Sequence, residues 1–262
     1  MRVQKKRVRE AFKILAIGLL LAGVAPAQEE PPPQRSAAAS EPTPRWPDGH
    51  PNLGSTPEHK GYWEIRPIGG VNRGPRPADI PAQPWARAVA GYRSEALMHS
   101  PLVDCKPATG ASFFNSPGFE IVEVPEQQKI YILDIAGPHS WRVVYMDGRE
   151  HPTGEDVRPT YLGHSVGHWD GDTLVIDTVN INEKQWVTGN FPSTNQLHLV
   201  ERIKRPALGS LDYDVTIDDP GAFTKPWTRG WSINESTSSS WIEGGEMFEY
   251  ICQDAEAEGF GY

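Results

Sequence analysis

Two strand-like runs meet at an Asp-Gly pair in the stretch HSVGHWDGDTLVID, residues 164–177. Asp-Gly between such runs is the strongest short-range signal for a β-hairpin. If Asp170-Gly171 is the two-residue loop, His164 lies directly opposite Asp177 as a non-hydrogen-bonded pair, the class in which side chains are closest. We therefore expect an imidazole in contact with a carboxylate, which would fix the histidine tautomer and raise its basicity.

Further short strands are expected on both sides of this hairpin. Gly, Asp or Pro turns join most neighbours, which leaves too little chain for parallel crossovers. The pattern predicts an all-β protein, an antiparallel meander that closes into a lipocalin-like (calycin-like) barrel, because closure removes free edges. A two-sheet β-sandwich is the alternative. The expected strands lie near residues 119–124, 129–136, 140–146, 163–169, 172–179, 197–204, 211–218, 227–235 and 241–252.

The chain divides into five parts by composition. Residues 1–27 combine basic residues, an apolar run and a small-x-small site, the pattern of a secretory signal peptide, with a membrane anchor as the alternative. Residues 28–45 are expected to be a disordered tether. Residues 46–118 are expected to form an irregular N-terminal wrap with one short helix from Trp85 to Tyr92. The expected barrel covers residues 119–254, and residues 255–262 form a tail.

Composition narrows the classes of function. Hydrophobic residues make up 38% and charged residues 23% of the 262 positions, which suits one packed domain. Removal of residues 1–27, which carry a charge of +5, takes the formal net charge from −9 to −14. This acidity disfavours nucleic acid and anionic membranes as partners of a periplasmic or secreted protein. The usual phosphate-loop, nucleophile-elbow and zinc motifs are absent from the sequence, so no cofactor is predicted.

Both cysteines, Cys105 and Cys252, lie in the part expected to be exported, where thiols oxidise. We predict that they form a disulfide, which would tie the chain before the first strand to the last strand. A bridge over so long a loop contributes about 4 to 5 kcal/mol in the chain-entropy model. The alternative is a pair of free, buried thiols.

One carboxylate falls on the expected core face of its strand. Apolar residues alternate along residues 197–204, and Glu201 has the same parity. An unpaired carboxylate there is costly, so Glu201 is a candidate catalytic acid or base. The alternative is a buried ion pair with Arg142 or Arg229. His198 has the opposite parity and ranks lower, although a bulge would reverse its direction.

Aromatic residues are frequent on the expected strands, and inside a barrel they would form an apolar pocket. Core packing is their more common role, so they support a pocket only together with polar residues. The candidate ligand-binding residues are Tyr131, Trp141, Tyr145, Trp227, Trp231 and His198.

His164 and His168 have a spacing that on a helix would suggest a shared metal ion. On a strand they lie roughly 13 Å apart, too far for one zinc ion. A metal site would instead need His164 with His198 and Glu201, which is a weaker alternative, and no metal is predicted.

Three motifs resemble a family of exported bacterial proteins. They are RWPDGHP at 45–51, GHSVGHWDGDTLVIDT at 163–178, and TIDDP at 216–220 followed by KPW at 225–227. The resemblance extends from Trp46 to about Asp254 and implies export, but it implies no particular activity. In architecture the strand-rich part is similar to lipocalin-like barrels, which include carriers of small apolar ligands and some cofactor-free enzymes.

Two functions fit these features. The first hypothesis is an exported, cofactor-free enzyme that performs elimination, decarboxylation or isomerisation on a small aromatic or apolar molecule. His164 would be the base and Asp177 would orient it, while Glu201 would be the acid, and Tyr213 or Tyr145 would stabilise an oxyanion. The second hypothesis is a carrier that binds such a molecule without chemistry. It predicts that an arginine neutralises Glu201 and that His164 faces solvent.

Overall fold

The computed structural model describes residues 41–64, 71–98, 100–102, 104–107, 118–135, 140–155, 157–233 and 240–252. All of these residues belong to one unit, Arg35–Tyr262. The expected signal peptide, most of the expected tether and the expected tail lie outside the described residues.

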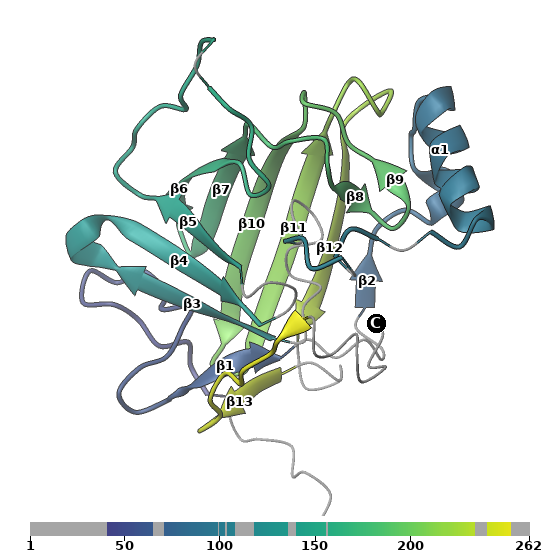
Figure 1. Ribbon diagram of the computed structural model, residues 1–262. Helices are drawn as coiled ribbons and strands as arrows, with labels where there is room; N and C mark the ends of the chain where they lie inside the picture. The colour runs from purple at the N-terminus through teal and green to yellow at the C-terminus, as the bar shows by residue number, and fades with distance from the viewer. Residues whose placement is uncertain are drawn as a thin grey trace, which may run out of the picture. The chain divides into compact units, whose positions relative to one another are not determined.

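One eleven-stranded sheet dominates this part of the chain (Figure 1). Its strands, in spatial order, are β13 (Ser240–Glu243), β1 (Gly61–Glu64), β3 (Gly118–Val124), β4 (Lys129–Asp134), β5 (Trp141–Tyr145), β6 (His164–Asp170), β7 (Thr173–Val179), β10 (His198–Ala207), β11 (Ser210–Asp218), β12 (Trp227–Ile233) and β2 (Val71–Arg73). The remaining elements are the pair β8 (Trp186–Thr188) and β9 (Phe191–Pro192), helix α1 (Pro84–Glu95), and the 3-10 turns η2 (Pro77–Asp79) and η4 (Pro125–Gln127).

The all-β prediction is confirmed, but the predicted closed barrel is wrong. The edges of the sheet are β13 and β2, and within the described residues no pairing joins them. The prediction assumed short reversals throughout, whereas residues 146–163 connect β5 to β6 and allow these two strands to pair in parallel. The predicted N-terminal wrap also contributes strands, since β1 pairs with β13 and β3, and β2 pairs with β12.

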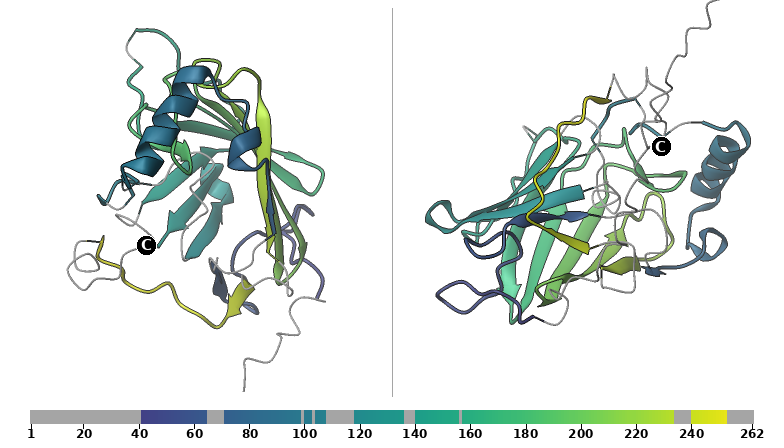
Figure 2. Two further views of the ribbon diagram at one scale, coloured as in Figure 1. Left: turned by 90° about the vertical axis from the view of Figure 1, so that its right-hand side faces the viewer. Right: turned by 90° about the horizontal axis from the view of Figure 1, so that it is seen from below.

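The sheet bends so that its two halves face each other, as the views in Figures 1 and 2 show. The rings of Phe119 on β3 and Trp231 on β12 lie 6.5 Å apart between centroids, although these strands are distant in the sheet order. Similarly, the guanidinium carbon of Arg205 on β10 lies 4.9 Å from the ring centroid of Trp63 on β1. The core therefore lies between two halves of a single sheet, and the alternative of two separate sheets is also wrong.

Strands β10 and β11 alternate between buried and more exposed residues, as the sequence predicts. We call the buried side of the sheet, which carries Leu199, Ile203 and Val215, the core face. The opposite side is called the outer face. This alternation decides which functional side chains can meet, because successive residues of a strand point to opposite faces.

The hairpin of β6 and β7 forms as predicted, but in a different register. Its loop is residues 171–172 instead of 170–171, so His164 lies opposite Val179 and not opposite Asp177. Gly171 occupies the first loop position with a φ of 58°, where a type II′ turn requires glycine. Because the shift moves the partner by two residues, His164 and Asp177 still share one face.

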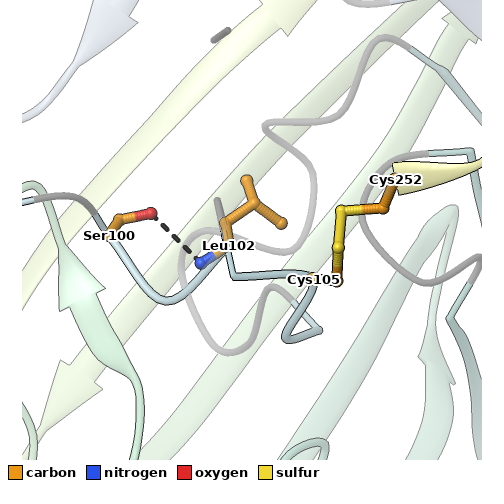
Figure 3. Close-up of a disulfide and its surroundings, with 4 residues drawn as sticks. All are labelled: Ser100, Leu102, Cys105 and Cys252. Atoms are coloured by element: carbon orange, nitrogen blue, oxygen red, sulfur yellow. Dashed lines mark hydrogen bonds between the residues drawn. A yellow bond between two sulfur atoms is a disulfide. The ribbon is translucent and has the colours of Figure 1, made fainter. Parts of the chain in front are cut away.

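The predicted helix and the predicted disulfide are both confirmed. Helix α1 begins at Pro84, whose fixed φ suits the first helical position, and it runs past Tyr92 to Glu95. Cys105 and Cys252 are bonded, with Cα atoms 5.8 Å apart (Figure 3). The bridge joins the segment after α1 to the segment after β13, because the last strand ends at Glu243 and not near residue 252.

Candidate functional site

The four predicted catalytic residues lie on two faces of the sheet. Glu201 pairs with Ile176 across β10 and β7, and both are fully buried on the core face. Asp177 pairs with Val200 one position away, and it points to the outer face. The structure therefore separates Glu201 and Tyr213 from His164 and Asp177, and the single site expected from the sequence does not assemble.

Glu201 is held in a closed ion pair inside the core. Its carboxylate accepts hydrogen bonds from both terminal nitrogens of Arg142, at 2.5 and 3.1 Å, and from the Tyr213 hydroxyl at 2.9 Å. Burial and the Glu201 charge raise the pKa of Tyr213 well above its ordinary value. The ring of Trp231 stacks on Tyr213 at 5.1 Å between centroids. The alternative that a buried arginine neutralises Glu201 is thus confirmed, with Arg142 as the partner.

The outer face carries a cluster of three histidines around one carboxylate, which we call the histidine cluster. One oxygen of Asp177 is 2.9 Å from Nε2 of His151, and the other is 2.9 Å from Nε2 of His198. The two Nδ1 atoms of His151 and His164 are 2.8 Å apart. His164 and Asp177 are therefore linked through His151, a residue that the sequence reasoning missed because a lone histidine in the long β5–β6 connection has no periodic signal.

The contact between His151 and His164 requires one ring nitrogen to donate and the other to accept, so both rings cannot carry a proton there. Burial, followed by the charges of His151 and Arg149, lowers the pKa of His164 from its ordinary value. Its ring also stacks on Tyr145 at 5.2 Å between centroids, and Arg149 covers Tyr145. The surroundings thus favour a neutral imidazole, the opposite of the more basic His164 that direct pairing with Asp177 would give.

The histidine cluster does not converge on one metal ion. In the described ranges no group of three histidine, cysteine or acidic side chains is placed to hold a metal. Asp177 contacts Nε2 of His151, whereas His164 contacts Nδ1 on another side of the same ring. The three side chains therefore do not direct their ligand atoms at one common point. The metal alternative of His164, His198 and Glu201 is not assembled, because Glu201 lies on the core face.

The predicted ligand-binding aromatics are also divided. Trp141 is 58% exposed, and Tyr131 and Tyr145 share its outer-face parity, so the expectation that these three point inward is wrong. In a half-buried sheet every second residue of a strand points to the outer face. The sequence alone does not show which of the aromatic residues have that parity. Of the remaining two, Trp231 packs on Tyr213 in the core, and Trp227 lies in the wall of a pocket.

That pocket, of about 520 Å³, lies between α1, the β8–β9 turn, residues 74–80 and the start of β12. Figure 1 shows these elements side by side at the right of the sheet. The wall is mostly apolar, with Ile80, Ala90, Phe191 and Trp227 among its residues. Arg93 of α1 donates to the Asn190 carbonyl at 3.1 Å and so ties the helix to the β8–β9 turn.

Of the described residues that form the pocket wall, two are arginines and none is an aspartate or glutamate. Arg87 of α1 donates to the backbone carbonyls of Pro77 and Ile80 and so fixes the turn that borders the pocket. Arg229 of β12 donates a hydrogen bond to the Thr188 hydroxyl, its one hydrogen-bond partner among the described residues. Burial lowers the pKa of Arg229 from its ordinary value, as expected for a cation that no carboxylate in the described part of the chain contacts.

Comparisons with protein-family models, with curated proteins and with solved structures found no match for this chain. Among the described residues, no helix is long and apolar enough to cross a membrane.

Proposed function

We propose that the protein is an exported binding protein that holds a small, largely apolar molecule in the pocket between α1 and β12. One observation carries the proposal: the pocket wall combines Trp227, Phe191 and Ile80 with the small residues of α1. Its volume of about 520 Å³ falls in the range of roughly 300 to 1,000 Å³ typical of small-molecule sites. Such a wall binds by burying apolar surface of the ligand.

The positions of the acid and base groups favour binding over catalysis. Glu201 is occupied by Arg142 and Tyr213, and His164 lies on the outer face, away from the core. The buried ion pair is what the carrier hypothesis predicts for Glu201, whereas His164 is only partly exposed. The acid–base enzyme remains the second candidate, favoured by the contact of one Asp177 carboxylate with two imidazoles.

Export is part of the proposal. It is supported by the signal-peptide pattern of residues 1–27 and by the disulfide between Cys105 and Cys252, since disulfides persist mainly in oxidising compartments. A binding protein in such a compartment would meet its ligand outside the cytoplasm.

Gly91 offers a way to close the pocket without disturbing the core. It lies on α1 in the pocket wall, and a Cβ placed on it would meet no heavy atom within 4 Å. We expect Gly91→Trp to fill the pocket and Gly91→Ala to leave it open. Both changes remove a glycine from a helix interior, which favours folding, more so for alanine than for tryptophan.

The test is a fluorescence titration with N-phenyl-1-naphthylamine, a neutral apolar probe whose emission rises on leaving water. We expect saturable binding to the unaltered protein and to Gly91→Ala, and at least a tenfold weaker affinity for Gly91→Trp. Absence of binding to the unaltered protein, or equal binding to the Gly91→Trp variant, would contradict the proposed function. Thermal melting of the variants checks that each remains folded.

A further inference from the structure

The buried arginines of this protein differ in how their charge and N–H groups are satisfied. Arg205 donates to the carbonyls of Asn52, Gly54 and Leu208 and lies over the rings of Trp63 and Trp241. Four of its N–H groups therefore donate to carbonyls within the fold, and the guanidinium also contacts two aromatic rings. A guanidinium carries five N–H donors in a fixed planar arrangement, and a buried one normally finds partners for most of them.

Arg229 does not follow this pattern. It lies on the core-face side of β12, since it pairs with the fully buried Val215 of β11. The Thr188 hydroxyl is its hydrogen-bond partner in the described chain, and no acidic side chain there contacts it. Arg229 is partly buried, no acidic side chain of the described residues balances its charge, and it borders the open volume of the pocket.

The pocket wall is also opposite in charge to the whole chain. The chain has a formal net charge of −9, yet the described wall contains Arg87 and Arg229 without a carboxylate. The remaining wall is apolar except for short polar groups such as Ser94 and Asn190. Such a wall matches a molecule that combines one anionic group with an apolar body.

We infer that the pocket takes a small carboxylic acid with an apolar body, whose carboxylate is bound by Arg229 and whose body packs against Trp227 and Phe191. This inference rests on the proposed function, because it names the class of ligand for the same pocket. A carboxylate is planar and singly charged, and it accepts two parallel hydrogen bonds from one guanidinium.

The test compares two ligands that differ only in charge. 2-Naphthoate and 2-naphthamide have nearly the same shape, and their binding is followed by isothermal titration calorimetry of the full protein. Removal of a charge-assisted hydrogen-bond pair typically lowers affinity by about tenfold to a hundredfold. We expect 2-naphthoate to bind at least tenfold more tightly than 2-naphthamide, and Arg229→Met to abolish that difference while still binding both ligands.

Arg202→Met is the matched control, because Arg202 is an arginine of the outer face that pairs with Asp170. It should keep the preference for 2-naphthoate. Arg229→Lys should keep a reduced preference, since a lysine retains the charge but not the planar pair of donors. Melting curves identify any variant that fails to fold, and in that case the comparison of the two ligands on the unaltered protein still decides the inference.

Equal binding of the two naphthalene ligands to the unaltered protein would overturn the anionic ligand while leaving the proposed function intact. Binding of neither ligand, together with failure of N-phenyl-1-naphthylamine to bind, would contradict the proposed function itself. Tighter binding of 2-naphthyl phosphate than of 2-naphthoate would overturn the choice of a carboxylate. Unchanged selectivity in Arg229→Met would remove Arg229 from the site.

Discussion

Arg142 and Arg229 both project from strands toward the interior of the bent sheet, but their surroundings differ. Arg142 forms two hydrogen bonds to Glu201, which Tyr213 also contacts, and all three side chains are buried. Arg229 contacts one hydroxyl and borders a pocket whose described wall contains no carboxylate. A buried charge that is paired within the fold contributes to stability, whereas a charge without a counter-charge at the opening of a pocket is available to a ligand.

The largest effect should follow from removal of one partner of the closed ion pair. Arg142→Met leaves the Glu201 carboxylate buried without its counter-charge, which typically costs about 3–5 kcal/mol. We expect a fall of that size in the free energy of unfolding, measured by urea denaturation. The double variant Arg142→Met/Glu201→Met should recover most of the loss, because it removes both charges. A single variant as stable as the unaltered protein would show that this pair is not a closed structural unit.

Removal of Arg229 should have a much smaller effect on stability. Arg229→Met replaces a poorly satisfied cation by an apolar side chain of similar length, so we expect the free energy of unfolding without ligand to change by less than about 1 kcal/mol, or to rise. The same urea denaturation measures it, with Arg142→Met as the comparison. A loss as large as that of Arg142→Met would mean that Arg229 is a structural residue.

The smallest effect concerns the histidine cluster and the pH dependence of stability. The pKa of His164 is lowered in the folded state by burial and by the nearby charges of His151 and Arg149, while Asp147 acts in the opposite direction. The ordinary pKa of histidine is about 6.5, so near this pH His164 binds a proton more readily in the unfolded chain than in the folded protein. The free energy of unfolding therefore falls as the pH falls from that value toward the folded pKa.

We expect His164→Asn to lose less stability than the unaltered protein between about pH 7.5 and pH 5.5, a window that spans the ordinary pKa. Thermal unfolding at the two pH values measures the difference. His168→Asn is the control, because His168 is an exposed residue of the same strand. An identical pH dependence for the unaltered protein and both variants would show that His164 titrates as it does in the unfolded chain.

The sequence predicted the features that follow from local pattern. Alternation along β10 placed Glu201 in the core, and Arg142 was one of the two arginines considered as its partner. The export pattern predicted the bond between Cys105 and Cys252. Asp-Gly located the β6–β7 hairpin, but it did not decide which residue opens the turn, and a II′ turn moved His164 away from Asp177.

The features that the sequence did not predict correctly depend on contacts between distant segments. The parallel pairing of β5 with β6 and the edge positions of β2 and β13 prevent the meander that the short turns suggested. The pocket is built from α1, the β8–β9 turn and β12, three segments that no local pattern connects. The sequence suggested Arg229 only as a possible partner for Glu201. It does not show that Arg142 forms this pair and that Arg229 lies in the pocket wall instead.

The most direct test of the pocket is a crystal structure of the protein grown with 2-naphthoate. We expect the carboxylate oxygens to lie about 2.7–2.9 Å from the guanidinium nitrogens of Arg229, with the naphthalene rings against Trp227 and Phe191. An empty pocket at saturating ligand, or a ligand bound at the histidine cluster instead, would contradict the assignment.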